Sequence, residues 1–216
     1  MNNQSKLESS QFVPSMEGDP PLQSKLYLVS KRIFDFIFAL IAGIVLLVPM
    51  IIIALLVRMD SPGPSIYKQE RLGLNGKKFM IYKFRSMNKN AEENGPQWAY
   101  KNDLRCTRIG RILRLTRLDE LPQLLNILKG DMSFVGPRPE RECFYELFET
   151  YIPNFRKRST VKPGLTGWAQ INGGYELGPE EKLKYDLEYI EKRNILFDIA
   201  CIIRTVRLVF THEGAR

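Results

Sequence analysis

The sequence predicts a mostly helical α+β protein in which an N-terminal membrane helix precedes a small domain with short strands. Residues 33–57 contain one charged residue, Asp35, and as a helix would measure about 37 Å, enough to cross a hydrocarbon core of ~30 Å. Residues 61–87 alternate apolar and polar positions between turn signals such as Asn75-Gly76, which favours short strands or a hairpin. Later segments repeat apolar residues at helical spacing.

Changes in composition divide the chain into three parts. Residues 1–30 are polar and aperiodic and are expected to form a flexible tail, residues 31–59 the membrane segment, and residues 60–216 the domain. Within the domain we expect a mobile polar loop over 88–103 and helices over 104–115, 120–129, 144–155, 179–194 and 195–210. Gly130 is suited to end the second of these helices.

The last expected helix carries an apolar stripe. Its members are Leu196, Ile199, Ile203, Val206 and Phe210, with Arg204 and Arg207 beside them. Such a stripe ordinarily faces the core of a domain. A helix that lies on a membrane surface is the alternative.

The composition limits the chemistry and the partners. A net charge of +8 predicts anionic partners, and charge alone leaves nucleic acid, an anionic membrane and a phosphorylated small molecule open. The single histidine, His212, lies near the C-terminus, which argues against a histidine-activated nucleophile. Three cysteines without CxxC spacing argue against a disulfide framework or a zinc site. Carboxylates, lysines, arginines or an oxygen-bound metal remain as candidate groups.

The topology of the membrane segment is open from the residues themselves. Pro49 lies near its middle and should kink the helix. Basic residues flank both ends, Lys31 and Arg32 before it and Arg58 after it, although such flanks normally mark the cytoplasmic side. A re-entrant helix would satisfy both flanks, whereas the length of the segment favours an ordinary single span.

Asp119 and Glu120 are the first candidates for chemistry. Asp119 stands where it would cap a helix over 120–129 with Pro122 in the first turn, and a cap alone is the ordinary interpretation. The alternative is a carboxylate that attacks phosphorus at a site where helix N–H groups favour a bound phosphate.

Basic residues surround this pair in the sequence. Arginines recur every three residues at Arg105, Arg108, Arg111, Arg114 and Arg117, either as a solvated or lipid-facing stripe or as groups that neutralise a diphosphate. Arg138 is held between Pro137 and Pro139. No P-loop, no GxGxxG after a strand and no DxD motif is present.

Five strings occur in an order that resembles one family. They are "KRIFDFIFA", "SPGPSIYKQERLGLNGKKF", "YKFRSM", "LDELPQLLNILKGDMSFVGPRP" and "VKPGLTGWAQING". Together they resemble the bacterial sugar transferases, the small monotopic polyprenyl-phosphate phosphoglycosyl transferases of exopolysaccharide, teichuronic acid and other cell-wall polymer synthesis. The resemblance covers about residues 31–212.

The resemblance implies a function and a set of roles. Asp119 would be the nucleophile that takes a sugar phosphate from a UDP-sugar and releases UMP, before undecaprenyl phosphate accepts it. Glu120 would assist the acceptor or the metal. Mg²⁺ would bridge phosphates near Asp119 with few protein ligands. The residues implied in substrate binding are Lys83, Arg85, Arg114, Pro137, Arg138 and Pro139.

The resemblance also implies a location. It favours a re-entrant helix broken at Pro49, with the domain on the cytoplasmic face of the bacterial membrane, and so reverses the preference for a single span. The expected partners are a UDP-sugar with GalNAc, galactose or glucose, undecaprenyl phosphate and the lipid bilayer, without nucleic acid; a homo-oligomer stays open. The alternative function is a membrane-anchored basic binding or scaffold protein.

Overall fold

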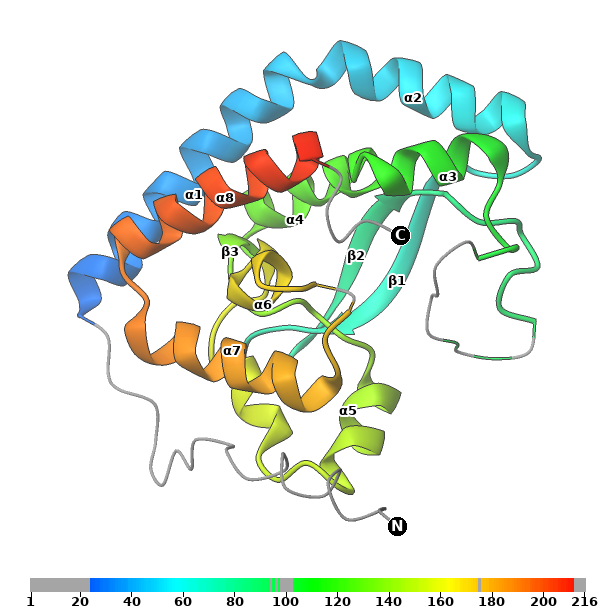
Figure 1. Ribbon diagram of the computed structural model, residues 1–216. Coiled ribbons are helices and arrows are strands. Elements are labelled where there is room, and N and C mark those ends of the chain that lie inside the picture. The colour runs from blue at the N-terminus through cyan, green and yellow to red at the C-terminus, as the bar shows by residue number, and fades with distance from the viewer. Residues whose placement is uncertain (1–23, 94, 96, 98–102, 175, 212–216) are drawn as a thin grey trace.

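The chain begins with two consecutive apolar helices that form an arch over the rest of the protein (Figure 1). They are α1 (Lys25–Val45) and α2 (Leu47–Asp60), bent by 63° at Leu46. In this computed structural model, which describes residues 24–93, 95, 97, 103–174 and 176–211, no single helix is long and apolar enough to cross a membrane. The bent pair together has the length and composition to do so.

Pro49 lies in the first turn of α2, one turn after the point where the bend begins. Proline has no N–H, and its ring clashes with the carbonyl four residues earlier, so the disruption falls on the N-terminal side of the proline. The predicted break is therefore confirmed, displaced to Leu46. Since α1 begins at Lys25, it includes residues that were assigned to the tail, whose residues 1–23 lie outside the described residues.

A β-hairpin follows α2, as predicted. Strands β1 (Ile66–Leu72) and β2 (Lys78–Phe84) pair antiparallel, joined by the 3-10 turn η1 (Leu74–Gly76). The turn needs positive φ at Asn75 (53°) and at Gly76 (74°), two residue types that adopt this conformation readily. Residues 67, 69, 71 and 83 all line one side of this hairpin.

The remaining elements are short except for two C-terminal helices. They are α3 (Arg108–Leu115), η2 (Leu118–Gln123), α4 (Leu124–Lys129), β3 (Ser133–Val135), α5 (Glu142–Glu149), η3 (Phe155–Thr160), β4 (Gly164–Thr166), α6 (Trp168–Ile171), α7 (Pro179–Lys192) and α8 (Ile195–Thr211). β3 and β4 pair in parallel, so the "SFVGPRP" and "KPGLTGW" strings lie side by side. The described part of the loop 88–103 contains neither helix nor strand.

The helix expected over 120–129 is two elements. Residues 118–123 form the 3-10 turn η2, and only residues 124–129 are α-helical, ending at Gly130 with φ of 90° as predicted. The cap of η2 is Arg117 in a left-handed conformation, so the prediction that Asp119 is a helix cap is wrong. Asp119 instead lies within the first turn of η2. The helix expected over 144–155 is shorter too, ending at Glu149.

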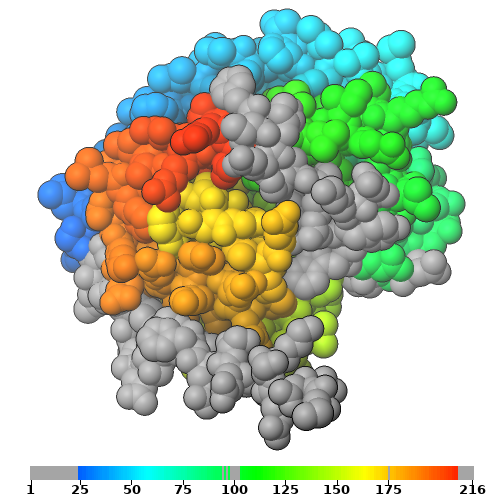
Figure 2. All heavy atoms as spheres, viewed as in Figure 1, coloured from blue at the N-terminus to red at the C-terminus, as the bar shows by residue number. Residues whose placement is uncertain are grey.

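The apolar helix pair is packed against the domain along one stripe only. Ala39 of α1 is buried with Leu124 and Ile127, and Ile53 and Val57 of α2 are buried with residues of β2 and α3. Most other apolar side chains of α1 and α2 are exposed. In Figure 2 the atoms of this pair form a continuous blue-to-cyan band along one edge of the molecule.

The predicted core-facing orientation of the 195–210 stripe is wrong. Leu196, Ile199, Ile203 and Val206 are exposed on α8, and the side chain of Phe210 lies outside the described residues. The opposite face of α8 carries the buried residues Asp198 and Cys201 and packs on the core and on β3. The outward apolar stripe is the pattern of an interfacial helix.

Candidate active site

A cavity of about 430 Å³ lies between the β-hairpin, the end of α3, η2 and the loop that follows β3. Eleven of the described residues that line it are lysine or arginine and three are aspartate or glutamate. Such an excess of positive charge in a concave site favours an anionic ligand. Guanidinium groups predominate, which suits the bidentate recognition of phosphate oxygens.

Asp119 is a buried carboxylate in the wall of this cavity. Among the described residues, no group donates a hydrogen bond to it. Burial and then the neighbouring charge of Glu120 raise its pKa to about 6, against the opposing effect of Lys83, Arg138 and Arg114. A carboxylate with this pKa is ionised at neutral pH, more basic than an ordinary aspartate and surrounded by cations.

Glu120 is the next residue but has the opposite environment. Its Oε1 accepts hydrogen bonds from Lys83 Nζ at 3.0 Å and from Arg138 Nη2 at 2.5 Å. Burial opposes ionisation of Glu120, but the charges of Arg138 and Lys83 and their hydrogen bonds outweigh it and hold its pKa far below the usual range. Glu120 is therefore a fixed anion that ties β2 to the loop after β3.

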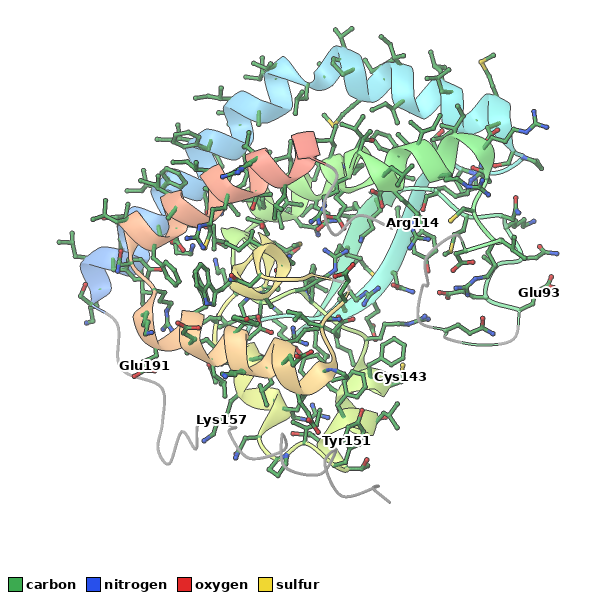
Figure 3. The ribbon with its side chains drawn as sticks, in the orientation of Figure 1. Glu93, Arg114, Cys143, Tyr151, Lys157 and Glu191 are labelled. Atoms are coloured by element: carbon green, nitrogen blue, oxygen red, sulfur yellow. The ribbon has the colours of Figure 1, made fainter. Side chains whose placement is uncertain are left out.

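Lys83, Arg138 and Arg114 lie together around Asp119, and their implied roles in substrate binding stay predictions. All three line the cavity, and the positive charge of each lowers the pKa of Asp119. Arg114 reaches it from the last turn of α3, on the side facing the hairpin (Figure 3), and its Nη1 donates to Cys106 Sγ at 3.1 Å.

Arg85 also lines the cavity, but its terminal nitrogens have other partners. Nη1 donates to the Pro62 carbonyl at 2.7 Å, and Nη2 donates to the carbonyls of Val57 at 3.1 Å and Ser61 at 2.6 Å. These carbonyls belong to the end of α2 and the turn after it, where helices leave acceptors without partners. Arg85 thus connects the hairpin to the end of the apolar helix pair.

Pro137 and Pro139 act through their backbone in this structure. The Pro137 carbonyl accepts from Gly164 N at 2.9 Å, and the Pro139 carbonyl accepts from Arg71 Nη1 at 3.3 Å. Neither proline is among the described residues that line the cavity. The two prolines fix the loop that presents Arg138.

The arginine series divides into two groups, one that lines the cavity and one that is exposed, and its role toward a diphosphate stays a prediction. Arg105, Arg114 and Arg117 are half-buried and line the cavity, whereas Arg108 and Arg111 are exposed. Arg105 and Arg117, at the two ends of the series, lie outside α3, which spans only residues 108–115. Turns therefore orient these two side chains, and one helix does not set the direction of all five.

The sequence reasoning missed several cavity residues. Arg71, Arg141 and Arg158 line the cavity. Arg158 is buried, its Nη2 lies 2.6 Å from Asp186 Oδ2, and the same nitrogen donates to the carbonyl of Arg138 at 3.1 Å. Alternation along β1 was the available signal for Arg71, because positions 67, 69 and 71 share a strand face. No local signal marks Arg158.

No group of three or more histidine, cysteine, aspartate or glutamate side chains in the described part of the chain could hold a metal ion. Mg²⁺ commonly takes one or two carboxylates and completes its shell with substrate phosphates and water. The Asp119 carboxylate suits that arrangement, because no described donor occupies it. Glu120 suits it less, because Lys83 and Arg138 already bind its carboxylate.

Fold and cavity together define a small α+β protein that can hold a polyanionic ligand beside an apolar helix pair. The family model described as "Bacterial sugar transferase" matches residues 26–212, and the chain belongs to this family. The predicted resemblance is thereby confirmed.

Several curated relatives are similar over most of the chain. A UDP-N-acetylgalactosamine-undecaprenyl-phosphate N-acetylgalactosaminephosphotransferase of Aeromonas hydrophila is 42% identical over 90% of this chain and 47% of its own length. A UDP-glucose:undecaprenyl-phosphate glucose-1-phosphate transferase of Caulobacter vibrioides is 37% identical over 96% of this chain and 79% of its own. A Bacillus subtilis protein provisionally named as an undecaprenyl-phosphate N-acetylgalactosaminyl 1-phosphate transferase is 54% identical over 61% of this chain and 74% of its own. The chain spans about half the length of some relatives it matches.

Proposed function

We propose that this protein is a phosphoglycosyl transferase that moves a sugar 1-phosphate from a UDP-sugar to undecaprenyl phosphate. The observation that carries the proposal is the buried Asp119 carboxylate, which has a raised pKa and lacks a described hydrogen-bond donor in a cavity lined by cations. The names of the relatives, which act on undecaprenyl phosphate and UDP-sugars, support the same class of enzyme.

In the first step, an oxygen of Asp119 attacks the sugar-linked phosphorus of the UDP-sugar. The bond from that phosphorus to the bridging oxygen breaks, and UMP leaves with the electron pair. The product on the protein is a sugar-phosphoryl-aspartate. Arg114, Lys83 and Arg138 surround Asp119 and would neutralise the charge on the diphosphate as the bridging bond breaks.

In the second step, an oxygen of undecaprenyl phosphate attacks the same phosphorus. The bond between phosphorus and Asp119 breaks, and the carboxylate is regenerated with its electron pair while undecaprenyl-diphosphate-sugar is released. The two steps conserve charge without a net proton transfer, which agrees with a nucleophile that is already ionised at neutral pH.

Glu120 has a positioning role in this scheme. Its hydrogen bonds hold Lys83 and Arg138 toward the cavity, and its charge contributes to the basicity of Asp119. Mg²⁺, when bound, would supply neutralisation of diphosphate charge, with Asp119 as a protein ligand and phosphate oxygens completing the shell.

The proposal includes a place in the membrane. The bent pair α1–α2 would enter the cytoplasmic leaflet of the bacterial membrane and return to the same face, supported by the 63° bend and by Lys31, Arg32 and Arg58 at the two ends. The exposed apolar stripe of α8 would lie at the interface. Cysteine labelling near residues 10 and 90 tests this: labels on opposite faces would contradict it.

The transferred sugar is proposed to be GalNAc, galactose or glucose, in the first membrane step of a cell-wall polymer or exopolysaccharide. A panel of UDP-sugars with undecaprenyl phosphate and Mg²⁺, assayed for UMP release, tests the activity and identifies the sugar. Ping-pong kinetics with parallel lines would distinguish the two-step route from a direct transfer. Polyanion binding without UMP release from any UDP-sugar would instead favour a basic scaffold protein.

A further inference from the structure

Arg117 has an unusual backbone conformation for its residue type. It connects α3 to η2 with φ of 57°, in the left-handed region. The other described non-glycine residues with positive φ are Asn75 and Asn154, and asparagine tolerates this region. For an arginine it costs about 1–2 kcal/mol. A strained residue beside a candidate nucleophile is a reason to ask what its side chain does there.

The turn at Arg117 separates polar from apolar side chains. Arg117 lines the cavity together with Asp119, two residues further along the chain. Its apolar neighbours in sequence, Leu115 and Leu118, are exposed to 42% and 37%. Arg117 therefore belongs to the cavity wall, whereas Leu115 and Leu118 belong to the outer surface.

The helices before and after this turn, α3 and α4, pack against the apolar pair α1–α2. Ile112 of α3 and Leu125 of α4 are exposed as well. α3 packs against α2, and α4 packs against α1, so the two helices that carry these side chains lie beneath the α1–α2 arch (Figure 1). The turn at Arg117 thus forms a rim of the cavity between two helices that pack against the apolar pair.

We infer that Arg117 binds the phosphate of the lipid acceptor at this rim, an inference that rests on the proposed function. The acceptor has an apolar chain and a phosphate head, so it needs an apolar surface that leads to a cation next to the nucleophile. Exposed leucines at positions 115 and 118, next to a cavity-lining arginine in the same turn, supply that combination. A guanidinium fork matches phosphate oxygens bidentately.

Arg117 forms and breaks no bond in the transfer. It would reduce the repulsion between the acceptor phosphate and the phosphoryl group on Asp119, and it would orient the attacking oxygen. The cations Lys83 and Arg138 are held by Glu120 and would serve the donor diphosphate. Separate cations for donor and acceptor predict that the two half-reactions respond differently to substitution at residue 117.

The test uses Arg117→Gly in the full-length protein, because glycine adopts the same backbone without strain while the side chain and its guanidinium are removed. Two rates are measured in detergent: exchange of labelled UMP into the UDP-sugar without lipid, and transfer as a function of undecaprenyl phosphate concentration. We expect exchange within about twofold of the wild type, and a KM for undecaprenyl phosphate raised about tenfold, as expected for the loss of one charge-assisted contact worth roughly 1.4 kcal/mol.

Two further variants complete the test. Arg117→Lys keeps the charge without the fork and should give an intermediate KM, and Arg111→Ala, on the exposed face of α3, should leave both rates unchanged. Equal losses of exchange and transfer in Arg117→Gly would overturn the inference, since Arg117 would then serve the donor. An unchanged KM for the lipid would also overturn it. A wild-type protein that neither exchanges nor releases UMP would overturn the proposed function itself.

Discussion

Asp119 and Glu120 are adjacent in the chain, but only Asp119 lines the cavity; the Glu120 carboxylate instead binds Lys83 and Arg138. The two pKa values diverge accordingly, upward for Asp119 and downward for Glu120. A pair of carboxylates whose environments push their pKa values apart is suited to two different tasks. One is the proposed nucleophile, and the other fixes the cations around it.

Asp119→Asn should abolish transfer and stabilise the fold. Burial raises the pKa of Asp119 to about 6, so a protonated Asp119 stabilises the folded state at low pH, and this contribution is lost as the pH rises through about 6. The neutral amide removes the cost of the buried charge. At pH 8 we expect a gain of about 1–3 kcal/mol, measured by thermal unfolding in detergent.

The stability gain of Asp119→Asn should shrink as the pH falls toward 4, where the wild-type carboxyl is protonated in the folded protein. Asp131→Asn, at a half-buried carboxylate beyond η2 and α4, is the matched control and should show no comparable gain at pH 8. A pH-independent gain would contradict the raised pKa of Asp119. Near-normal UMP release by Asp119→Asn would contradict its assignment as the nucleophile.

Glu120→Gln should shift the pH dependence of the first half-reaction. Since the charge of Glu120 raises the pKa of Asp119, its removal should lower that pKa and extend activity to more acidic pH. The rate at neutral pH should fall about tenfold or more, because Lys83 and Arg138 lose the acceptor that holds them. The measurement is UMP release against pH. An acid limb that stays in place would show that Glu120 does not act on Asp119.

Local patterns predicted the elements whose determinants are local. Asn75-Gly76 specified the hairpin turn, Gly130 ended α4, and Pro49 accounted for the break between α1 and α2. In each case one residue type supplies a backbone geometry or removes a donor within a turn of its position. The family strings then indicated which residues would gather around Asp119.

Tertiary contacts explain what could not be predicted. The stripe of α8 is amphipathic in the sequence, but periodicity does not say which face the core covers; buried Asp198, which binds Lys31 and Tyr189, turns the opposite face inward. Asp119 does not cap a helix, because η2 already begins at Leu118. Its cap is Arg117, in the left-handed conformation, and this could not be read from the sequence. The partners of Arg85 lie in a helix end that is distant in sequence.

Gly63→Ala should destabilise the protein by more than 2 kcal/mol, roughly the upper part of the range for single substitutions. A Cβ at Gly63 would collide with Arg85 Nη1, and the φ of 125° is one that alanine rarely adopts. Gly76→Ala is the matched control, because its φ of 74° is also positive but nothing lies within 4 Å of its Cβ. Its cost should be about 1 kcal/mol. Equal losses in thermal unfolding would show that contact with Arg85 is unimportant.

Ile203→Glu should weaken membrane association without unfolding the domain. Ile203 is 65% exposed in the apolar stripe of α8, so a charge there costs the fold little but opposes insertion into the interface. Leu147→Glu is the matched control: Leu147 is 53% exposed on α5, at the end of the domain away from the α1–α2 arch (Figure 1). In vesicle flotation at raised salt, Ile203→Glu should float less than the wild type, and Leu147→Glu equally well. If both variants float alike, the stripe on α8 does not contact lipid, and α1–α2 alone would hold the protein to the bilayer.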